Sequence, residues 1–141
     1  MKIKTLELTN YRNHKSFETQ FDPGTNVIVG PNGSGKTNIL EAIHLMATTK
    51  AYKAKYDKEV IRHDEVFAKI EAEVDENKLE VLITSDIKYE NVSHKKVKVN
   101  KVAKSLKSFS PYLYTVLFSP EEIEILRGSP GSRRHYMDMV L

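Results

Sequence analysis

Cysteine is absent from this chain of 141 residues, which excludes a disulfide framework and any zinc site built on thiolates. No apolar run approaches the ~18 residues that a membrane-spanning helix needs, and the opening residues MKIKTLELTNYRNH lack the apolar stretch of a secretory leader. The five histidines show no metal-binding spacing, and no nucleophile motif of the hydrolase type is present. We therefore expect a soluble, cytoplasmic protein without membrane contacts.

The composition is that of an ordinary globular domain. Apolar residues make up 40% of the chain and charged residues 29%, and the length suits one domain with a core but not two of typical size. The net charge of +3 is weak evidence for any partner. Composition alone therefore indicates no function.

The most informative segment is a glycine-rich loop between two apolar stretches. The β-branched residues 27–29 favour a strand covered on both faces, and residues 39–47 predict a buried helix. Strand, glycine loop and helix is the arrangement in which backbone N–H groups converge on a phosphate at a helix N-terminus. The loop fills the pattern G-x-x-x-x-G-K-[ST] without a mismatch, with Gly30, Pro31, Asn32, Gly33, Ser34, Gly35, Lys36 and Thr37.

Each position in this loop has an expected role. Gly30 allows the turn out of the strand, and Gly33 and Gly35 let the backbone approach phosphate oxygens. Lys36 is expected to reach the β- and γ-phosphates, and the Thr37 hydroxyl to ligate Mg²⁺. The alternative is a glycine turn that only caps a helix, which would not require a lysine and a hydroxyl directly after the last glycine.

Alternating apolar and polar residues predict several further strands. Two lie before the loop, around Leu6–Leu8 and at residues 17–21, and a hairpin is expected from residues 68–74 and 79–83. A helical turn is expected at residues 58–61, a tight turn at Asn100-Lys101 and a strand at residues 112–118. Two helices are expected to start at Ser119 and Ser129, and the second has no C-cap, which suggests a piece of a longer protein.

A lysine strip spans residues 88–107, which hold seven lysines and a single acid. Such a strip suits DNA phosphates through counterion release. The alternative is a solvated hairpin whose lysines keep an edge strand from aggregating. The strip has no arginine, so base reading is not expected, and the predicted DNA contacts are Lys95, Lys96, Lys98 and Lys101.

A nucleoside-triphosphatase also needs an apolar strand that ends in acidic residues near the Mg²⁺. The best candidate, residues 81–86, lies on the predicted hairpin with a charged partner and does not qualify. The glycine-serine segment at residues 128–132 is better explained as a boundary between two helices. We therefore expect the nucleotide to be bound by this chain and the catalytic site to be completed elsewhere.

Two blocks of sequence carry a family likeness. LELTNYRNHKSFETQFDPGTNVIVGPNGSGKTNILEAI and LFSPEEIEILRGSPGSRRHYMDMVL resemble the amino-terminal ATPase lobe of the RecF family, bacterial recombination mediators with an ABC-type head related to chromosome-maintenance ATPases. The resemblance implies an α/β fold, in which a mixed sheet carries the P-loop helix and an antiparallel β subdomain is attached. Residues 1–141 would then form this lobe as part of a longer chain.

The resemblance also implies a function. It predicts binding of ATP and Mg²⁺, an ATP-dependent homodimer and engagement of double-stranded DNA near gaps. The implied partners are the RecR and RecO mediators and, indirectly, the RecA recombinase. Arg12 and Asn13 match the family's loop that approaches the nucleotide phosphates, and Gly30 through Asn38 match its phosphate loop.

Three other functions remain open at this point. A small-molecule P-loop kinase normally places its phosphate loop directly after the first strand, whereas two strands precede it here. Another ABC-type ATPase subunit would carry a glutamine between its lobes, but the only glutamine is Gln20. A non-enzymatic DNA-binding module would leave the Lys36-Thr37 pair unexplained. Which residue near 119–122 serves the metal, if any does, is left open as well.

Overall fold

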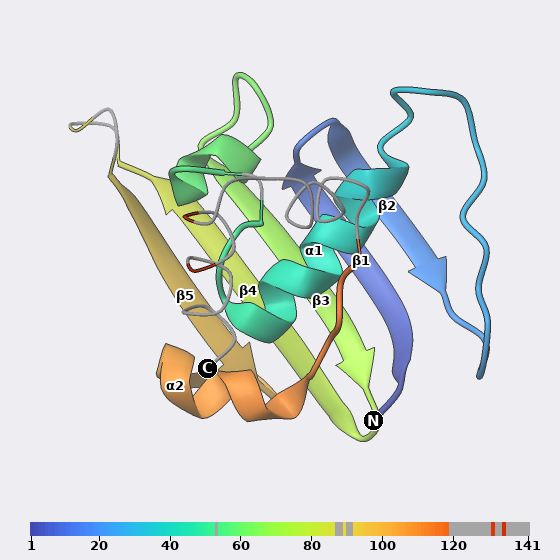
Figure 1. The fold of residues 1–141 in the computed structure, drawn as a ribbon. Helices are drawn as coiled ribbons and strands as arrows, with labels where there is room; N and C mark the ends of the chain where they lie inside the picture. The colour runs from blue at the N-terminus through green and yellow to red at the C-terminus, as the bar shows by residue number, and fades with distance from the viewer. Residues whose placement is uncertain (53, 87–88, 90–91, 119–130, 132–133, 135–141) are drawn as a thin grey trace.

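The computed structural model describes all residues except 53, 87–88, 90–91, 119–130, 132–133 and 135–141. Its main element is a six-stranded sheet with the order β2-β1-β3-β4-β5-β6, in which every neighbouring pair is antiparallel (Figure 1). The strands are β1 (Ile3–Tyr11), β2 (His14–Gln20), β3 (Phe67–Val74), β4 (Asn77–Ser85), β5 (Ser93–Val99) and β6 (Val102–Lys104).

The predicted hairpin is confirmed as β3 and β4. Apolar side chains alternate along both strands, and the register pairs Ala68 with Ile83 and Ile70 with Val81, so the buried side chains share one face. The turn is short, and Asp75 takes a positive φ of 51° there. The expected strands around Leu6–Leu8 and at residues 17–21 are likewise present as β1 and β2.

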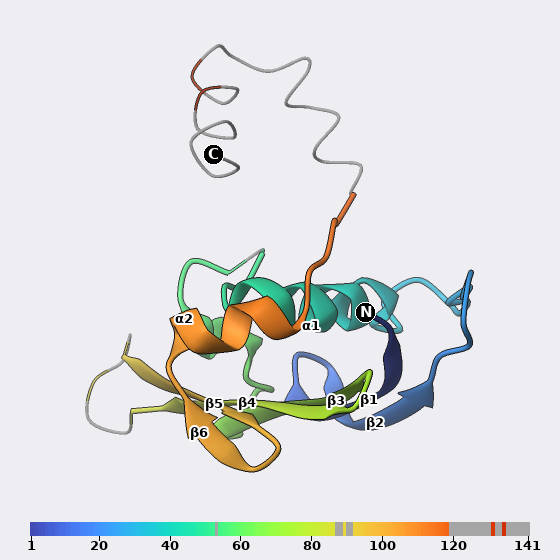
Figure 2. The same ribbon diagram turned by 90° about the horizontal axis from the view of Figure 1, so that it is seen from below.

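The long helix of the described residues, α1 (Lys36–Thr48), covers the apolar face of the sheet (Figure 2). It follows the glycine loop directly, as the sequence predicts. Its buried side chains include Ile39, Leu45 and Met46, which join Leu6 and Leu8 of the sheet in one core. The phosphate loop is therefore attached to a helix that the core holds rigidly in place.

Three short helical elements complete the described chain. They are the 3₁₀ turn η1 (Asp57–Val60), which corresponds to the helical turn expected near residues 58–61, and α2 (Leu106–Phe109) with η2 (Ser110–Tyr112). The helix predicted from Ser119 lies outside the described residues, and of the helix predicted from Ser129 the structure describes only Gly131 and Arg134, both of which are helical. Among the residues that the structure describes, no helix has the length and apolarity to cross a membrane.

Two strand predictions are wrong for this chain. Residues 27–29 form no strand, and Val27 and Val29 are 78% and 83% exposed. Residues 113–118 are also outside any ladder and lead away from the sheet on the α1 side, with Val116 99% exposed (Figure 2). A β-branched run becomes a strand only when a neighbour supplies its backbone hydrogen bonds, and no described segment does so here.

The expected mixed sheet is corrected for the same reason. The parallel part of such a sheet would have been built on residues 27–29, which remain unpaired in the described structure. What the structure shows is the antiparallel part, with the P-loop helix packed against it. The α/β character therefore comes from a helix on an antiparallel sheet.

Candidate nucleotide-binding site

The glycine loop adopts a conformation that requires glycine at two positions. Gly33 and Gly35 have φ values of 80° and 94°, in the left-handed region that other residues rarely adopt. Gly35 is the residue directly before α1, and the Ile39 N–H donates to its carbonyl at 3.2 Å. The loop thus turns tightly into the helix.

The N-terminus of α1 is prepared for an anion. No side chain caps it, and no acidic residue lies in its first turn. The first N–H groups of a helix have no partner within the helix, and the helix dipole adds positive potential there. This end of α1 can therefore donate several backbone hydrogen bonds to phosphate oxygens.

Lys36 lies across the loop that precedes it. Its Nζ donates to the carbonyl oxygens of Gly30 at 2.8 Å and of Pro31 at 2.7 Å. An ammonium group has three donors, so one remains for a phosphate oxygen. The positive charge is thus held over the same backbone that would receive the phosphates.

The predicted Mg²⁺ ligand, Thr37, is exposed in the first turn of α1. Within the described residues, no cluster of three or more histidine, cysteine, aspartate or glutamate side chains could hold a metal ion. A hydroxyl beside a phosphate site nevertheless suits Mg²⁺, because this ion takes few protein ligands and completes its shell with water and phosphate oxygens. The donor set fits a nucleotide-bound Mg²⁺ and not a metal site made by protein alone.

The turn between β1 and β2 packs directly on the glycine loop. Asn13 Nδ2 donates to the Gly33 carbonyl at 3.1 Å, and Asn13 Oδ1 accepts from Asn38 Nδ2 at 2.9 Å. His14 Nε2 lies 3.1 Å from the Gly35 carbonyl. Sequence reasoning placed Asn13 near the nucleotide phosphates and missed His14, whose signal was its position directly after Asn13, at the start of β2.

Arg12 is held by a buried acid on α1. Its Nε and Nη2 donate to the two carboxylate oxygens of Glu41 at 2.9 and 2.6 Å, and its Nη1 donates to the Glu59 carbonyl at 2.8 Å. Glu41 is only 3% exposed, and its hydrogen bond raises the pKa of Arg12 above the usual value. Burial and the Glu41 charge also raise the pKa of the neighbouring Tyr11 phenol, which stays neutral.

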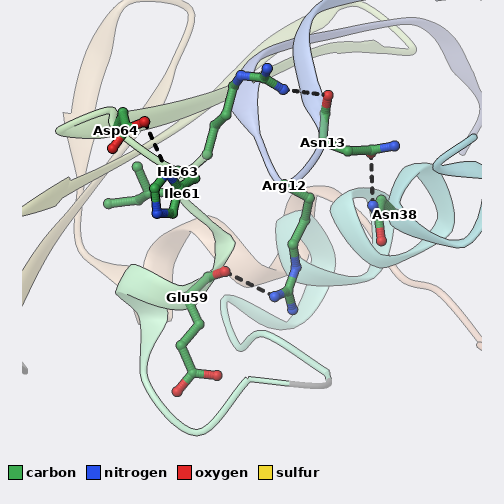
Figure 3. A pocket seen from close by; sticks show the side chains of 8 residues that line it. Arg12, Asn13, Asn38, Glu59, Ile61, His63 and Asp64 are labelled. Atoms are coloured by element: carbon green, nitrogen blue, oxygen red, sulfur yellow. Dashed lines mark hydrogen bonds and ion pairs between the residues drawn. The ribbon is translucent and has the colours of Figure 1, made fainter. Parts of the chain in front are cut away.

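This fixed arrangement leaves Arg12 able to bind a ligand. A guanidinium group has five N–H donors, of which three are used by Glu41 and Glu59. Arg12 also lines a pocket of about 540 Å³ beside the start of α1. Figure 3 shows Arg12, Asn13 and Asn38 on one side of this pocket and Ile61, His63 and Asp64 on the other.

The predicted DNA contacts do not form one surface. Lys95 shares a face of β5 with the buried Val97 and Val99, and its Nζ lies 2.9 Å from Asp57 and 2.5 Å from the Thr49 carbonyl. Lys96 and Lys98 lie on the opposite face, where Lys98 pairs with Glu80 at 2.7 Å. Lys101 lies exposed in the turn before β6. Lys95 is therefore a structural residue, and the lysine strip is divided.

Comparison with known proteins identifies the fold and the family. The AAA ATPase domain family matches residues 1–126. The chain belongs to this family. It is 41% identical over 143 residues to the DNA replication and repair protein RecF of Bacillus velezensis, covering 99% of this chain and 37% of that protein. The RecF protein of Staphylococcus haemolyticus is 39% identical over 142 residues, covering 100% and 38%.

Solved structures agree with this assignment. The recombination mediator protein RecF-ATPrS in the RecFOR pathway superposes with a TM-score of 0.81 at 31% identity, covering 97% of this chain and 37% of that one. An SMC ATPase structure described in terms of ATP-driven dimerization gives a TM-score of 0.77 at 20% identity, which shows the shared fold. The chain matches the amino-terminal ATPase region of RecF and spans 37% to 38% of the length of these RecF proteins.

Proposed function

We propose that this chain is the ATP-binding lobe of a RecF-like ATPase of DNA replication and repair. The observation that supports this most directly is the loop of residues 30–35, which leads into the uncapped N-terminus of α1 with Lys36 folded over it. The family match makes a small-molecule kinase a poorer explanation of the same loop.

In this proposal the chain contacts both the phosphates and the nucleoside of ATP. Its phosphates lie against the backbone of residues 32–38, with Lys36 at the β- and γ-phosphates and Thr37 on Mg²⁺. Its nucleoside extends toward the pocket beside Asn38. The two remaining N–H donors of Arg12 are available to a ligand oxygen between the phosphate loop and the pocket.

A titration with ATP, with and without Mg²⁺, tests the proposal. ATP with Mg²⁺ should bind far more tightly than AMP, because AMP lacks the phosphates that Lys36 and the loop would contact. Equal affinities for ATP and AMP would contradict the assignment, since the nucleoside pocket alone would then explain binding.

Further properties belong to the whole protein and are part of the proposal. They are an ATP-dependent homodimer, binding to double-stranded DNA near gaps, cooperation with the RecR and RecO mediators, and assistance in loading the RecA recombinase. Support comes from relatives named DNA replication and repair protein RecF and from a related structure described in the RecFOR pathway.

Purified alone, the 141-residue chain is expected to hydrolyse ATP no faster than its Lys36→Ala variant. Its sequence supplies the phosphate loop but no acidic Mg²⁺ strand and no signature loop. The release of inorganic phosphate over time would measure this. Hydrolysis that depends on Lys36 would show that residues such as Asp86 or Glu121 complete the site after all.

Changing Lys96 and Lys101 together to glutamine is expected to flatten the salt dependence of DNA binding. Each lost phosphate contact lowers the slope of log affinity against log salt by about 0.9, so two contacts give a change of up to about two. Full-length protein with ATP should be titrated with duplex DNA at several salt concentrations. Lys50→Gln is the control, because Lys50 is exposed beyond the C-terminal end of α1 and lies outside the lysine strip. An unchanged slope in the double variant would mean that these lysines only solvate the hairpin.

A further inference from the structure

The carbonyl groups of a phosphate-binding loop need hydrogen-bond donors on the side that faces away from the phosphate. When its N–H groups converge on an anion, its carbonyl groups point away from that anion and need donors of their own. The described structure supplies such donors from side chains for Gly33 and for Gly35, whose carbonyl also accepts from the Ile39 N–H at 3.2 Å. Asn13 Nδ2 donates to the first carbonyl, and His14 Nε2 contacts the second, both at 3.1 Å.

We propose that Asn13 and His14 are positioning residues that hold the phosphate loop in its anion-binding conformation. They act through the loop backbone and do not touch the nucleotide phosphates themselves. This inference rests on the proposed ATP-binding function of the same loop. It also gives Asn13 a different role from the direct approach to phosphate that the sequence suggested.

The fit between turn and loop is close. A Cβ atom at Gly35 would collide with the His14 ring and with Asn13 Oδ1, so the turn approaches the loop as closely as glycine permits. A carbonyl oxygen only accepts hydrogen bonds, so His14 must carry its proton on Nε2 in this contact. The His14 ring also contacts the Phe17 ring, with ring centroids 5.1 Å apart.

The turn is itself anchored, which a positioning role requires. Arg62 Nη1 donates to the Asn13 carbonyl at 2.7 Å, and the Arg12 N–H donates to the Val60 carbonyl at 2.7 Å. The Arg62 N–H adds a bond to the Asn10 carbonyl at 2.8 Å. These bonds join the turn to residues 60–62, so its side chains present donors to the loop from a fixed backbone.

The test compares His14→Leu with His14→Gln in the full-length protein. Leucine removes the donor, whereas the glutamine amide can still donate to the Gly35 carbonyl. Titrations with ATP and with inorganic triphosphate, both with Mg²⁺, should show affinity about three- to tenfold weaker for His14→Leu and nearly unchanged for His14→Gln. Because the loss acts on the loop, both ligands should lose affinity by the same factor. His94→Leu serves as the control variant.

Other results would overturn the inference without touching the proposed function. If His14→Leu binds both ligands as tightly as the wild type, the inference is wrong, even if the melting temperature of the variant falls. A loss for ATP but not for triphosphate would place His14 at the nucleoside instead. If His14→Leu does not fold, Asn13→Ala takes its place with the same expectation. Wild-type protein that binds neither ligand would instead refute the proposed function.

Discussion

Replacing Lys36 with alanine should weaken ATP binding about ten- to a hundredfold. The substitution removes a charge-assisted contact worth about 1.5–3 kcal/mol. In the structure the Lys36 ammonium already lies over the loop, bonded to the Gly30 and Pro31 carbonyls, so it needs little reorganisation to meet a phosphate. Titration of the wild type and the variant with ATP and Mg²⁺ measures the difference.

Lys50→Ala is the matched control for this experiment. Lys50 is exposed just beyond the C-terminal end of α1, so its removal changes the net charge equally but leaves the loop intact. Its affinity for ATP should match that of the wild type. Equal affinity in the Lys36 and Lys50 variants would refute the assignment of the loop as the phosphate site.

Arg12→Ala should destabilise the fold by about 3–5 kcal/mol, the usual cost of removing one partner of a buried ion pair. The loss of stability comes from the Glu41 carboxylate, which remains buried in the variant. The Glu41 side chain is 4% exposed, and without Arg12 its carboxylate loses two charge-assisted hydrogen bonds in a place that water barely reaches. Urea unfolding followed by circular dichroism would measure the loss.

Two comparisons separate burial from charge in that result. The Lys98–Glu80 pair is almost as short, 2.7 Å against 2.6 Å, but its lysine side chain is 38% exposed, so Lys98→Ala should cost no more than about 1 kcal/mol. The double variant Arg12→Met with Glu41→Met should recover most of the stability, because an apolar pair leaves no buried charge. If Arg12→Ala proved as mild as Lys98→Ala, the pair would not be a stabilising element of the site.

Local patterns predicted the parts of the fold that depend on local chemistry. The alternation in residues 68–74 and 79–83 gave the hairpin and its buried face, because a period of two assigns side chains to faces directly. The glycine loop and the start of α1 followed from the motif. The same alternation could have separated Lys95 from Lys96, since Lys95 is two residues from the buried Val97.

Contacts across the fold could not be predicted in this way. Glu41 lies 29 residues from Arg12, and Gly35 lies 21 residues from His14, so neither contact has a local signal in the sequence. The strand prediction for residues 27–29 was wrong for a related reason. β-Branched residues indicate that a segment suits a strand, but its hydrogen-bond ladder depends on a neighbouring strand. The sequence shows which residue types are present, but it does not show which residues contact each other in the fold.

Four exposed apolar side chains on unpaired backbone have a consequence for expression of this polypeptide. Val27, Val29, Val116 and Phe118 are 78%, 83%, 99% and 74% exposed on backbone that no described strand pairs with. Extended apolar segments of this kind are templates for edge-to-edge aggregation and attract chaperones and proteases. Expression of the 141 residues by themselves should therefore engage the chaperones and proteases of the host, and co-expressed chaperones should raise the yield of intact protein.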